Sequence, residues 1–236
     1  IYHDLLDDFK DSLTLYNHGQ LNLEQRAQAE NLFVVACRNL LPKLDNRNRG
    51  HRPVIDELNE RLAEKLFVNL SVFQSMPDAW GIDQLFPVLP LQGLDQAPSF
   101  RGKIQDVTCD SDGCLYRYVD GQGIESSLPL PPPPINDDYL MGFFLVGAYQ
   151  ETLGDLHNLF GDTCSVDVYL TDDGFSIDHV LMGDSVQDVL KYVSYDEKAL
   201  LSCYQDKVSA SGLSEDEQIQ LIETYKKVLR GSTYLS

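Results

Sequence analysis

The chain of 236 residues carries 18 basic and 37 acidic residues, which gives a formal net charge of −19. This charge argues against nucleic acid or an anionic membrane as the main partner, because both repel an acidic protein. Hydrophobic residues make up 43% of the chain and charged residues 23%, which excludes a disordered, collagen-like or coiled-coil chain. No apolar run approaches the roughly 20 residues of a membrane-spanning helix, so we expect no membrane contact.

The cysteine content indicates the redox compartment. Five cysteines are present, and no two of them form a Cys-x-x-Cys pair. This pattern fits a reducing compartment, the cytoplasm, better than a disulfide scaffold or a zinc site. The chain begins with Ile1 and not with Met, so we expect a fragment or a processed piece of a longer chain.

Helical periodicity dominates residues 1–66. The predicted helices are residues 4–16, 22–41 and 54–66. Asn22 and Gln25 have the spacing of a capping box at the start of the second helix, and Pro42 ends it. Three amphipathic helices in succession predict a helical bundle over residues 1–66.

Alternating apolar and polar residues indicate β-structure from Phe67 onward. The predicted strands are residues 68–72, 103–108, 115–119, 124–128, 141–146, 166–170 and 175–179. The turns at residues 120–123 and 172–174 predict two hairpins. We therefore expect an antiparallel β-domain over residues 67–182, similar to a barrel or a sandwich.

Other segments interrupt or follow these strands. Prolines leave room for only a short helical turn within residues 78–86 and predict an extended surface loop at 129–134. Residues 149–159 predict a helix that Gly161 ends. Helical periodicity returns after Gly183 and predicts a helical C-terminal extension over residues 183–236. Ser214 with Glu217 predicts a further capping box within it. Helices, then an antiparallel sheet, then helices predict an α+β fold.

Few general motifs of catalysis are present. The sequence contains no glycine-rich nucleotide loop and no His-Glu-x-x-His zinc motif. The acidic turn at residues 110–113 is only faintly similar to a calcium loop, because Gly121 stands where the loop needs a glutamate, and we reject a calcium site there. We interpret His157 as a solvated or capping histidine.

Cys109 ends a predicted strand, where working side chains are often presented. Tyr149 follows another predicted strand and stands at the start of a predicted helix. The carboxylate of Asp110 disfavours a thiolate at Cys109, so the thiol stays protonated and can donate a proton. A half-buried small residue before a turn is the alternative, and composition alone favours it. The hydroxyl of Tyr149, beside free backbone N–H groups, can bind a phosphate. An aromatic residue packed at a strand–helix corner explains Tyr149 equally well.

Three long motifs in this order resemble the C-terminal part of the bacterial biosynthetic arginine decarboxylases. The motifs are residues 73–87, 106–113 and 142–163, and residues 51–58 are also similar. The family belongs to the alanine-racemase-like, fold type III enzymes that use pyridoxal phosphate. The resemblance implies an N-terminal (β/α)8 barrel with the cofactor lysine, which this chain does not contain. It also implies a helical insertion, a C-terminal β-domain and a helical tail.

The resemblance implies the conversion of L-arginine to agmatine and CO2 in polyamine and spermidine biosynthesis. The chain would act only with its own N-terminal barrel region, in a homodimer or tetramer with the active site at the dimer interface. The implied cofactors are pyridoxal 5'-phosphate and Mg2+, although the sequence shows no ligand cluster for a metal. Two alternatives stay open. One is a non-catalytic oligomerisation or processed subunit, and the other is a related decarboxylase for a different basic amino acid.

The resemblance also assigns roles to single residues. Cys109 donates a proton to the substrate Cα, Asp110 contacts the distal end of the substrate, and Tyr149 hydrogen-bonds the cofactor phosphate. A guanidinium prefers a planar, bidentate carboxylate partner. Asp83 and, after it, Asp78 are the candidates for that partner. A turn or capping aspartate is an equally good explanation of either residue.

Overall fold

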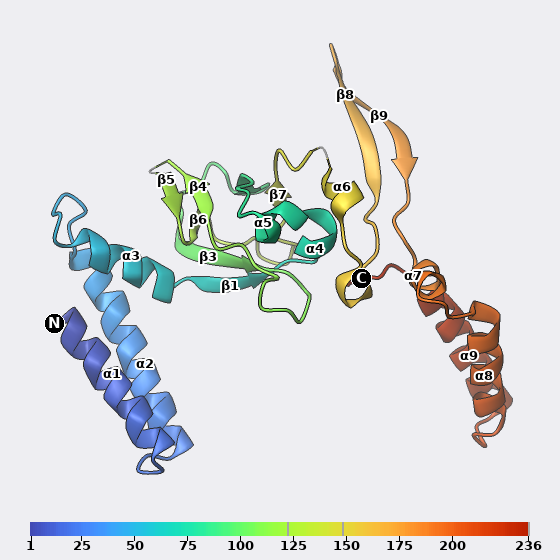
Figure 1. Ribbon diagram of the computed structural model, residues 1–236, viewed down its shortest axis with the longest axis horizontal. Coiled ribbons are helices and arrows are strands. Elements are labelled where there is room, and N and C mark those ends of the chain that lie inside the picture. The colour runs from blue at the N-terminus through green and yellow to red at the C-terminus, as the bar shows by residue number, and fades with distance from the viewer. Residues whose placement is uncertain (122, 148, 236) are drawn as a thin grey trace. The chain divides into compact units, whose positions relative to one another are not determined.

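The computed structural model describes residues 1–121, 123–147 and 149–235 (Figure 1). It divides into two compact units. The first contains Ile1–Leu66, Pro87–Ile104 and Tyr116–Phe143, and the second contains Phe67–Phe86, Gln105–Leu115 and Phe144–Ser236. Three residues that belong to predicted features lie outside the described residues. They are Gln122 of the first hairpin turn, Ala148 of the third motif and Ser236 of the C-terminal extension.

The first unit begins with the predicted helical bundle. Its helices are α1 (Tyr2–Asn17), α2 (Leu23–Leu40), the 3-10 helix η1 (Leu41–Lys43) and α3 (Arg52–Arg61). Their shared core consists of Tyr2, Leu6, Phe33, Cys37 and Leu58. The capping box is confirmed, since Asn22 accepts from the backbone of Gln25 and the Gln25 side chain accepts from the backbone of Asn22.

Small sheets occupy much of the rest of the first unit, and β3 pairs with β6 in antiparallel fashion. Strands β1 (Glu64–Phe67), β3 (Phe100–Gln105) and β6 (Leu128–Leu130) form a sheet in the order β1-β3-β6. Strand β2 (Val88–Pro90) pairs with β7 (Met141–Phe143), and β4 (Tyr118–Asp120) pairs with β5 (Gly123–Glu125). The predicted α+β fold class is confirmed.

Sheet pairing overturns three local predictions. The third helix does not continue to Leu66, because Glu64–Phe67 is the strand β1 beside β3. The strand predicted at 68–72 is wrong, since Val72 begins a helix. Pro129 does not start a surface loop. It lies within β6 opposite Arg101, and the next residue, Leu130, is fully buried.

The second unit contains short helices, one long hairpin and a helical extension. The short helices are α4 (Val72–Ser75), α5 (Pro77–Gly81), α6 (Gln150–Leu153) and the 3-10 helix η2 (His157–Leu159). The extension consists of α7 (Val186–Tyr192), α8 (Glu197–Ser209) and α9 (Glu215–Leu229). Stacking of Tyr204 on Tyr225 joins α8 to α9, and the predicted capping box of Ser214 and Glu217 is confirmed.

The helix predicted at residues 149–159 is wrong beyond its first turn. Asn158 and Leu159 have positive φ angles of 56° and 63°, which a right-handed helix does not allow. Gly154 ends α6 and packs on the carbonyl of Gln74, which an added Cβ would approach to 2.5 Å. Contact with a segment distant in sequence therefore ends this helix.

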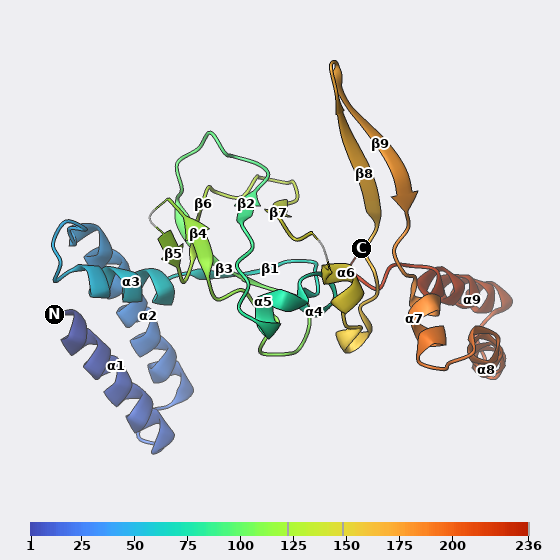
Figure 2. The same cartoon turned by 45° about the horizontal axis from the view of Figure 1, so that its top comes forward.

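The hairpin of β8 (Ser165–Thr171) and β9 (Gly174–Leu181) is confirmed, and Figure 2 shows it as a two-stranded ribbon. Directly paired residues share one face of a ladder. Val168 pairs with Ile177 and Leu170 with Phe175, so one face is apolar, and Leu170 is 91% exposed. We call these four residues the hairpin face. No helix in the described part of the chain is both long and apolar enough to cross a membrane.

Candidate active site

The three sequence motifs meet in the second unit. The carbonyl of Phe73 in the first motif accepts a hydrogen bond from the backbone N–H of Asp155 at 3.0 Å. The ring of Phe73 packs at a tilt against His157, with ring centroids 4.3 Å apart. Cys109 of the second motif contacts Asn158, which follows His157 in the third. Residues separated by more than 80 positions thus form one cluster, as Phe73 and His157 show.

Asp106 holds the loop that presents Cys109. Its side chain is 1% exposed and lies at the end of β3. One carboxylate oxygen accepts from the backbone N–H of Val72 at 2.9 Å, and the other accepts from the backbone N–H and the hydroxyl of Thr108 at 2.8 and 2.6 Å. Gly113 closes the loop, since its carbonyl accepts from the N–H of Asp106 at 2.8 Å. This closure ends the strand at Gln105, three residues before the predicted end.

Cys109 lies exposed at the tip of this loop. Its backbone N–H donates to Oδ1 of Asn158 at 3.2 Å. Its sulfur lies 3.6 Å from the same oxygen and 3.4 Å from Nδ2 of Asn158. The thiol is therefore accessible to a substrate and is held by one side chain.

Asp110 stands beside Cys109 and faces His157. Oδ2 of Asp110 lies 3.6 Å from Nε2 of His157, and Oδ1 accepts from the backbone N–H of Asp112 at 2.9 Å. The interpretation of His157 as a solvated or capping residue is wrong, because its ring packs between Phe73 and Asp110. The loop thus presents a thiol and a carboxylate side by side.

The two candidate guanidinium partners differ in their surroundings. Asp78 is bound by Gln150, whose Nε2 donates to the Asp78 carboxylate at 2.6 Å and whose Oε1 accepts from the Asp78 N–H at 3.2 Å. Asp83 is exposed and has a positive φ of 55°. No hydrogen bond or ion pair joins its carboxylate to another residue in the described part of the chain. Asp78 has a structural partner, whereas Asp83 is available to a ligand.

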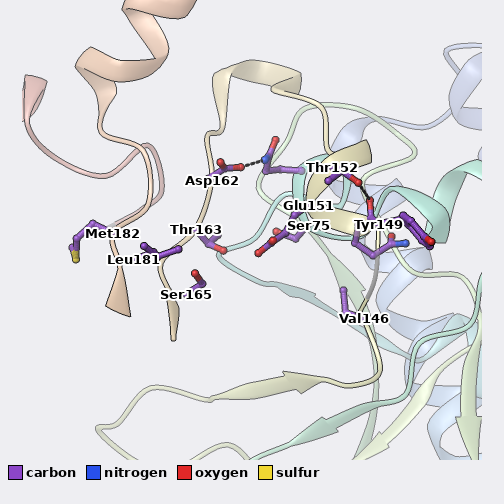
Figure 3. A pocket seen from close by; sticks show the side chains of 13 residues that line it. Ser75, Val146, Tyr149, Glu151, Thr152, Asp162, Thr163, Ser165, Leu181 and Met182 are labelled. Carbon is purple, nitrogen blue, oxygen red and sulfur yellow. Dashed lines mark hydrogen bonds between the residues drawn. The ribbon is translucent and has the colours of Figure 1, made fainter. Parts of the chain in front are cut away.

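Tyr149 lines an open pocket of about 720 Å³ in the second unit (Figure 3). Its backbone is left-handed, with a φ of 73°, and its side chain is 75% exposed. Its hydroxyl has no hydrogen-bond partner among residues 1–121, 123–147 and 149–235. The other walls include Gln74, Glu151, Asp162 and Met182, and Figure 3 shows the side chains of Asp162 and Tyr149 on separate segments. Cys109, Asp110, Asp78 and Asp83 are not among the lining residues.

Tyr234 anchors the C-terminal segment next to the third motif. Its hydroxyl donates to the carbonyl of Gly161 at 2.9 Å, and its ring packs on Phe160. Burial, with the nearby charge of Asp162, raises the pKa of Tyr234 to about 12. This contact fixes the segment that leads from η2 into the pocket wall.

The structure thus brings Cys109 and Asp110 together and leaves Tyr149 and Asp83 at separate exposed positions. Sequence reasoning missed the roles of His157 and Asn158 in this cluster. The only signal for them was their place in the third motif, because spacing along the chain does not show which residues meet.

Two family models define the class of protein to which these units belong. Residues 1–59 match the arginine decarboxylase helical bundle domain, and residues 186–235 match the arginine decarboxylase C-terminal helical extension. These matches cover α1, α2 and most of α3 at one end and α7 to α9 at the other. The chain is therefore built from domains of the arginine decarboxylase class.

Whole-chain comparisons agree with the domain matches. The chain is 54% identical over 236 residues to the biosynthetic arginine decarboxylase of Marinobacter nauticus, and 53% identical over 235 residues to that of Alkalilimnicola ehrlichii. These alignments cover 100% and 99% of this chain but 37% of each relative. The crystal structure of the biosynthetic arginine decarboxylase SpeA from Campylobacter jejuni matches with a TM-score of 0.79 and 30% identity, over 100% of this chain and 36% of that chain. The chain belongs to the biosynthetic arginine decarboxylase family and corresponds to the C-terminal part of its members.

Proposed function

We propose that this chain is the C-terminal part of an arginine decarboxylase that uses pyridoxal 5'-phosphate and converts L-arginine to agmatine and CO2. One observation carries the proposal. Cys109 and Asp110 are presented side by side on a loop held by the buried Asp106, in a chain 54% identical to a biosynthetic arginine decarboxylase. The product would enter polyamine and spermidine biosynthesis in the cytoplasm.

In this proposal Cys109 supplies the proton that replaces the lost carboxyl group. The S–H bond breaks, a C–H bond forms at the substrate Cα, and the sulfur is left as a thiolate that solvent reprotonates. A positioned acid of this kind contributes about 10²- to 10⁴-fold to a rate. Asp110 contacts the distal end of the substrate. Asp83 is the stronger candidate for the guanidinium, because Gln150 already occupies Asp78.

The residues of this chain fit a phosphate-bearing cofactor at one point. The exposed hydroxyl of Tyr149 can donate to a phosphate oxygen at the edge of the pocket. When bound, the cofactor supplies an electron sink for the charge left at Cα after CO2 departs. The described residues do not fit Mg2+, since they contain no group of three or more His, Cys, Asp or Glu that could hold a metal ion. No step proposed here uses a metal.

The proposed activity requires more polypeptide than this chain. The N-terminal barrel region would carry the cofactor lysine, and a second subunit would complete the active site at a dimer interface. The hairpin face supports this requirement, because a two-stranded ribbon with exposed apolar side chains is at best marginally stable in water. The exposure of Cys109 supports it as well, since a proton donor works inside a site that excludes water.

The test is Cys109→Ala in the full-length enzyme. We expect the formation of agmatine to slow about a hundredfold, with cofactor still bound and part of the product diverted to 4-guanidinobutanal by transamination. Cys203→Ala, which changes an exposed thiol on α8, is the matched control and should keep normal turnover. Normal agmatine formation by Cys109→Ala would remove Cys109 from the mechanism. Faster turnover of ornithine than of arginine would contradict the proposed substrate.

A further inference from the structure

The side chain of Asn158 makes two opposite kinds of contact with the sulfur of Cys109. The thiol can donate to Oδ1 of Asn158 at 3.6 Å, and Nδ2 of Asn158 can donate to the sulfur at 3.4 Å. The protonated sulfur is a donor, whereas the thiolate is only an acceptor. The amide of Asn158 therefore offers an acceptor, Oδ1, to the protonated sulfur and a donor, Nδ2, to the thiolate.

The same amide also fixes the backbone of Cys109. Oδ1 of Asn158 accepts from the Cys109 N–H at 3.2 Å, so the amide contacts both the main chain and the side chain of one residue. Two contacts from a single planar group restrict the rotation of the thiol. Cys109 is exposed, and Asn158 is the only residue in the described part of the chain that hydrogen-bonds to its sulfur.

Neighbouring residues hold Asn158 in place. Its φ of 56° lies in the left-handed region, which asparagine adopts more readily than other residues with a Cβ. The ring of His157, directly before it, packs at a tilt against Phe73 with centroids 4.3 Å apart, and Leu159 after it also has a positive φ of 63°. Contacts other than the one with Cys109 therefore hold the backbone from which the amide projects.

The charges around Cys109 explain why a neutral hydrogen-bond donor beside its sulfur matters. Asp110 and Asp112 lie on the same loop, and their carboxylates oppose negative charge on the sulfur. His157 faces Asp110 at 3.6 Å, and its Nε2 has no hydrogen-bond partner among the described residues. A neutral N–H donor stabilises a thiolate without placing a positive charge beside a cationic substrate.

We infer that Asn158 is a positioning residue for Cys109, which orients the thiol for proton transfer and stabilises the thiolate that the transfer leaves. This inference rests on the proposed function of Cys109 as the proton donor. In the step, the S–H bond breaks, the proton forms the new bond at Cα, and the electron pair stays on sulfur, where Nδ2 of Asn158 donates to it. Asn158 itself gains and loses no proton.

The first test measures the reactivity of the Cys109 thiol and does not depend on decarboxylation. Asn158→Asp keeps the size and the left-handed backbone but replaces the N–H donor by a carboxylate. We expect alkylation of Cys109 by iodoacetamide at about pH 7.5 to slow about tenfold in this variant, because the thiolate is the reactive form. Asn158→Gly, which keeps the backbone and removes the amide, should slow it about threefold. Mass spectrometry of peptides measures the alkylation of Cys109 and of the exposed Cys203 in the same sample.

Two controls separate positioning from a loss of structure. Asn136→Gly changes another exposed asparagine with a positive φ of 62°, in the first unit, and should leave both alkylation rates unchanged. The fluorescence of Trp80, the single tryptophan, should be the same in every variant if the second unit stays folded. An unchanged ratio of Cys109 to Cys203 alkylation in folded Asn158→Asp would overturn the inference.

The second test uses the full-length enzyme. Asn158→Asp should lower kcat about tenfold with little change in KM for arginine, and should raise the share of 4-guanidinobutanal. Slower alkylation with normal kcat and normal products would also overturn the inference. Failure of the proposed function gives a different result. Cys109→Ala would then turn over arginine normally, while Asn158→Asp would still slow the alkylation of Cys109.

Discussion

Replacing Asp106 by asparagine should lower the free energy of unfolding of the second unit by about 3 kcal/mol. The two carboxylate oxygens of Asp106 accept three hydrogen bonds at 2.6 to 2.9 Å from Val72 and Thr108, and the side chain is 1% exposed. An amide keeps only one of these oxygens. Its NH2 group then faces at least one N–H, of Val72 or Thr108, that has no other acceptor among the described residues.

The magnitude follows from those contacts. A hydrogen bond to a charged group contributes about 1.5 to 3 kcal/mol, and a buried donor left without a partner costs about 1 to 3 kcal/mol. Loss of one such bond, with one N–H of the loop or of α4 left unsatisfied, gives about 3 kcal/mol. For a slope of about 2 kcal/mol/M in urea, the unfolding midpoint should fall by about 1.5 M.

Trp80 makes the measurement specific to this unit. It is the single tryptophan, it lies in α5, and its ring is 5.3 Å from that of Phe73. Its fluorescence in a urea titration therefore reports on the unit that contains Asp106. Asp112→Asn is the matched control, because it makes the same change at an exposed position of the same loop. A midpoint shift in Asp106→Asn no larger than in Asp112→Asn would refute the reasoning.

Two further predictions use the same assay. The pKa of Tyr234 is raised to about 12, so the folded chain holds the phenol proton more tightly than the unfolded chain does. The contribution of this proton to the free energy of unfolding is therefore complete below pH 10 and is lost between about pH 10 and 12. The unchanged chain should lose about 2 kcal/mol more than Tyr234→Phe over this range, and equal losses would contradict the raised pKa. Gly113→Ala should cost about 2 kcal/mol, because its Cβ would lie 2.5 Å from Oγ1 of Thr108 and would also press on Asp106. Gly121→Ala, where an added Cβ meets nothing within 4 Å, should cost much less, and equal costs would rule out the clash.

Features that depend on neighbouring residues could be predicted from the sequence. The capping boxes at Asn22 and Ser214 form because each partner lies three residues away on the first turn of the same helix. The hairpin of β8 and β9 follows from two alternating segments joined by a tight turn. The spacing alone specifies such contacts, so they were predicted correctly.

Features that depend on distant partners could not be predicted in this way. Residues 64–66 continue a helical pattern, yet they lie in β1 because the edge of β3 offers them backbone partners. Pro129 is typical of a loop, but it lies in β6 opposite Arg101. In each case pairing with a strand distant in sequence outweighs the local preference.

The candidate site also combines features that neighbouring residues set with contacts between residues distant in sequence. Three long motifs identify the family from the amino-acid sequence, and they single out Cys109 and Asp110 as a thiol and a carboxylate at the end of a strand. The contacts of Asn158 with Cys109 and of His157 with Asp110 span 49 and 47 positions of the chain and are visible only in the folded structure. Both pairs depend on a left-handed turn and on the packing of His157 against Phe73, and these form only when the three motifs pack together.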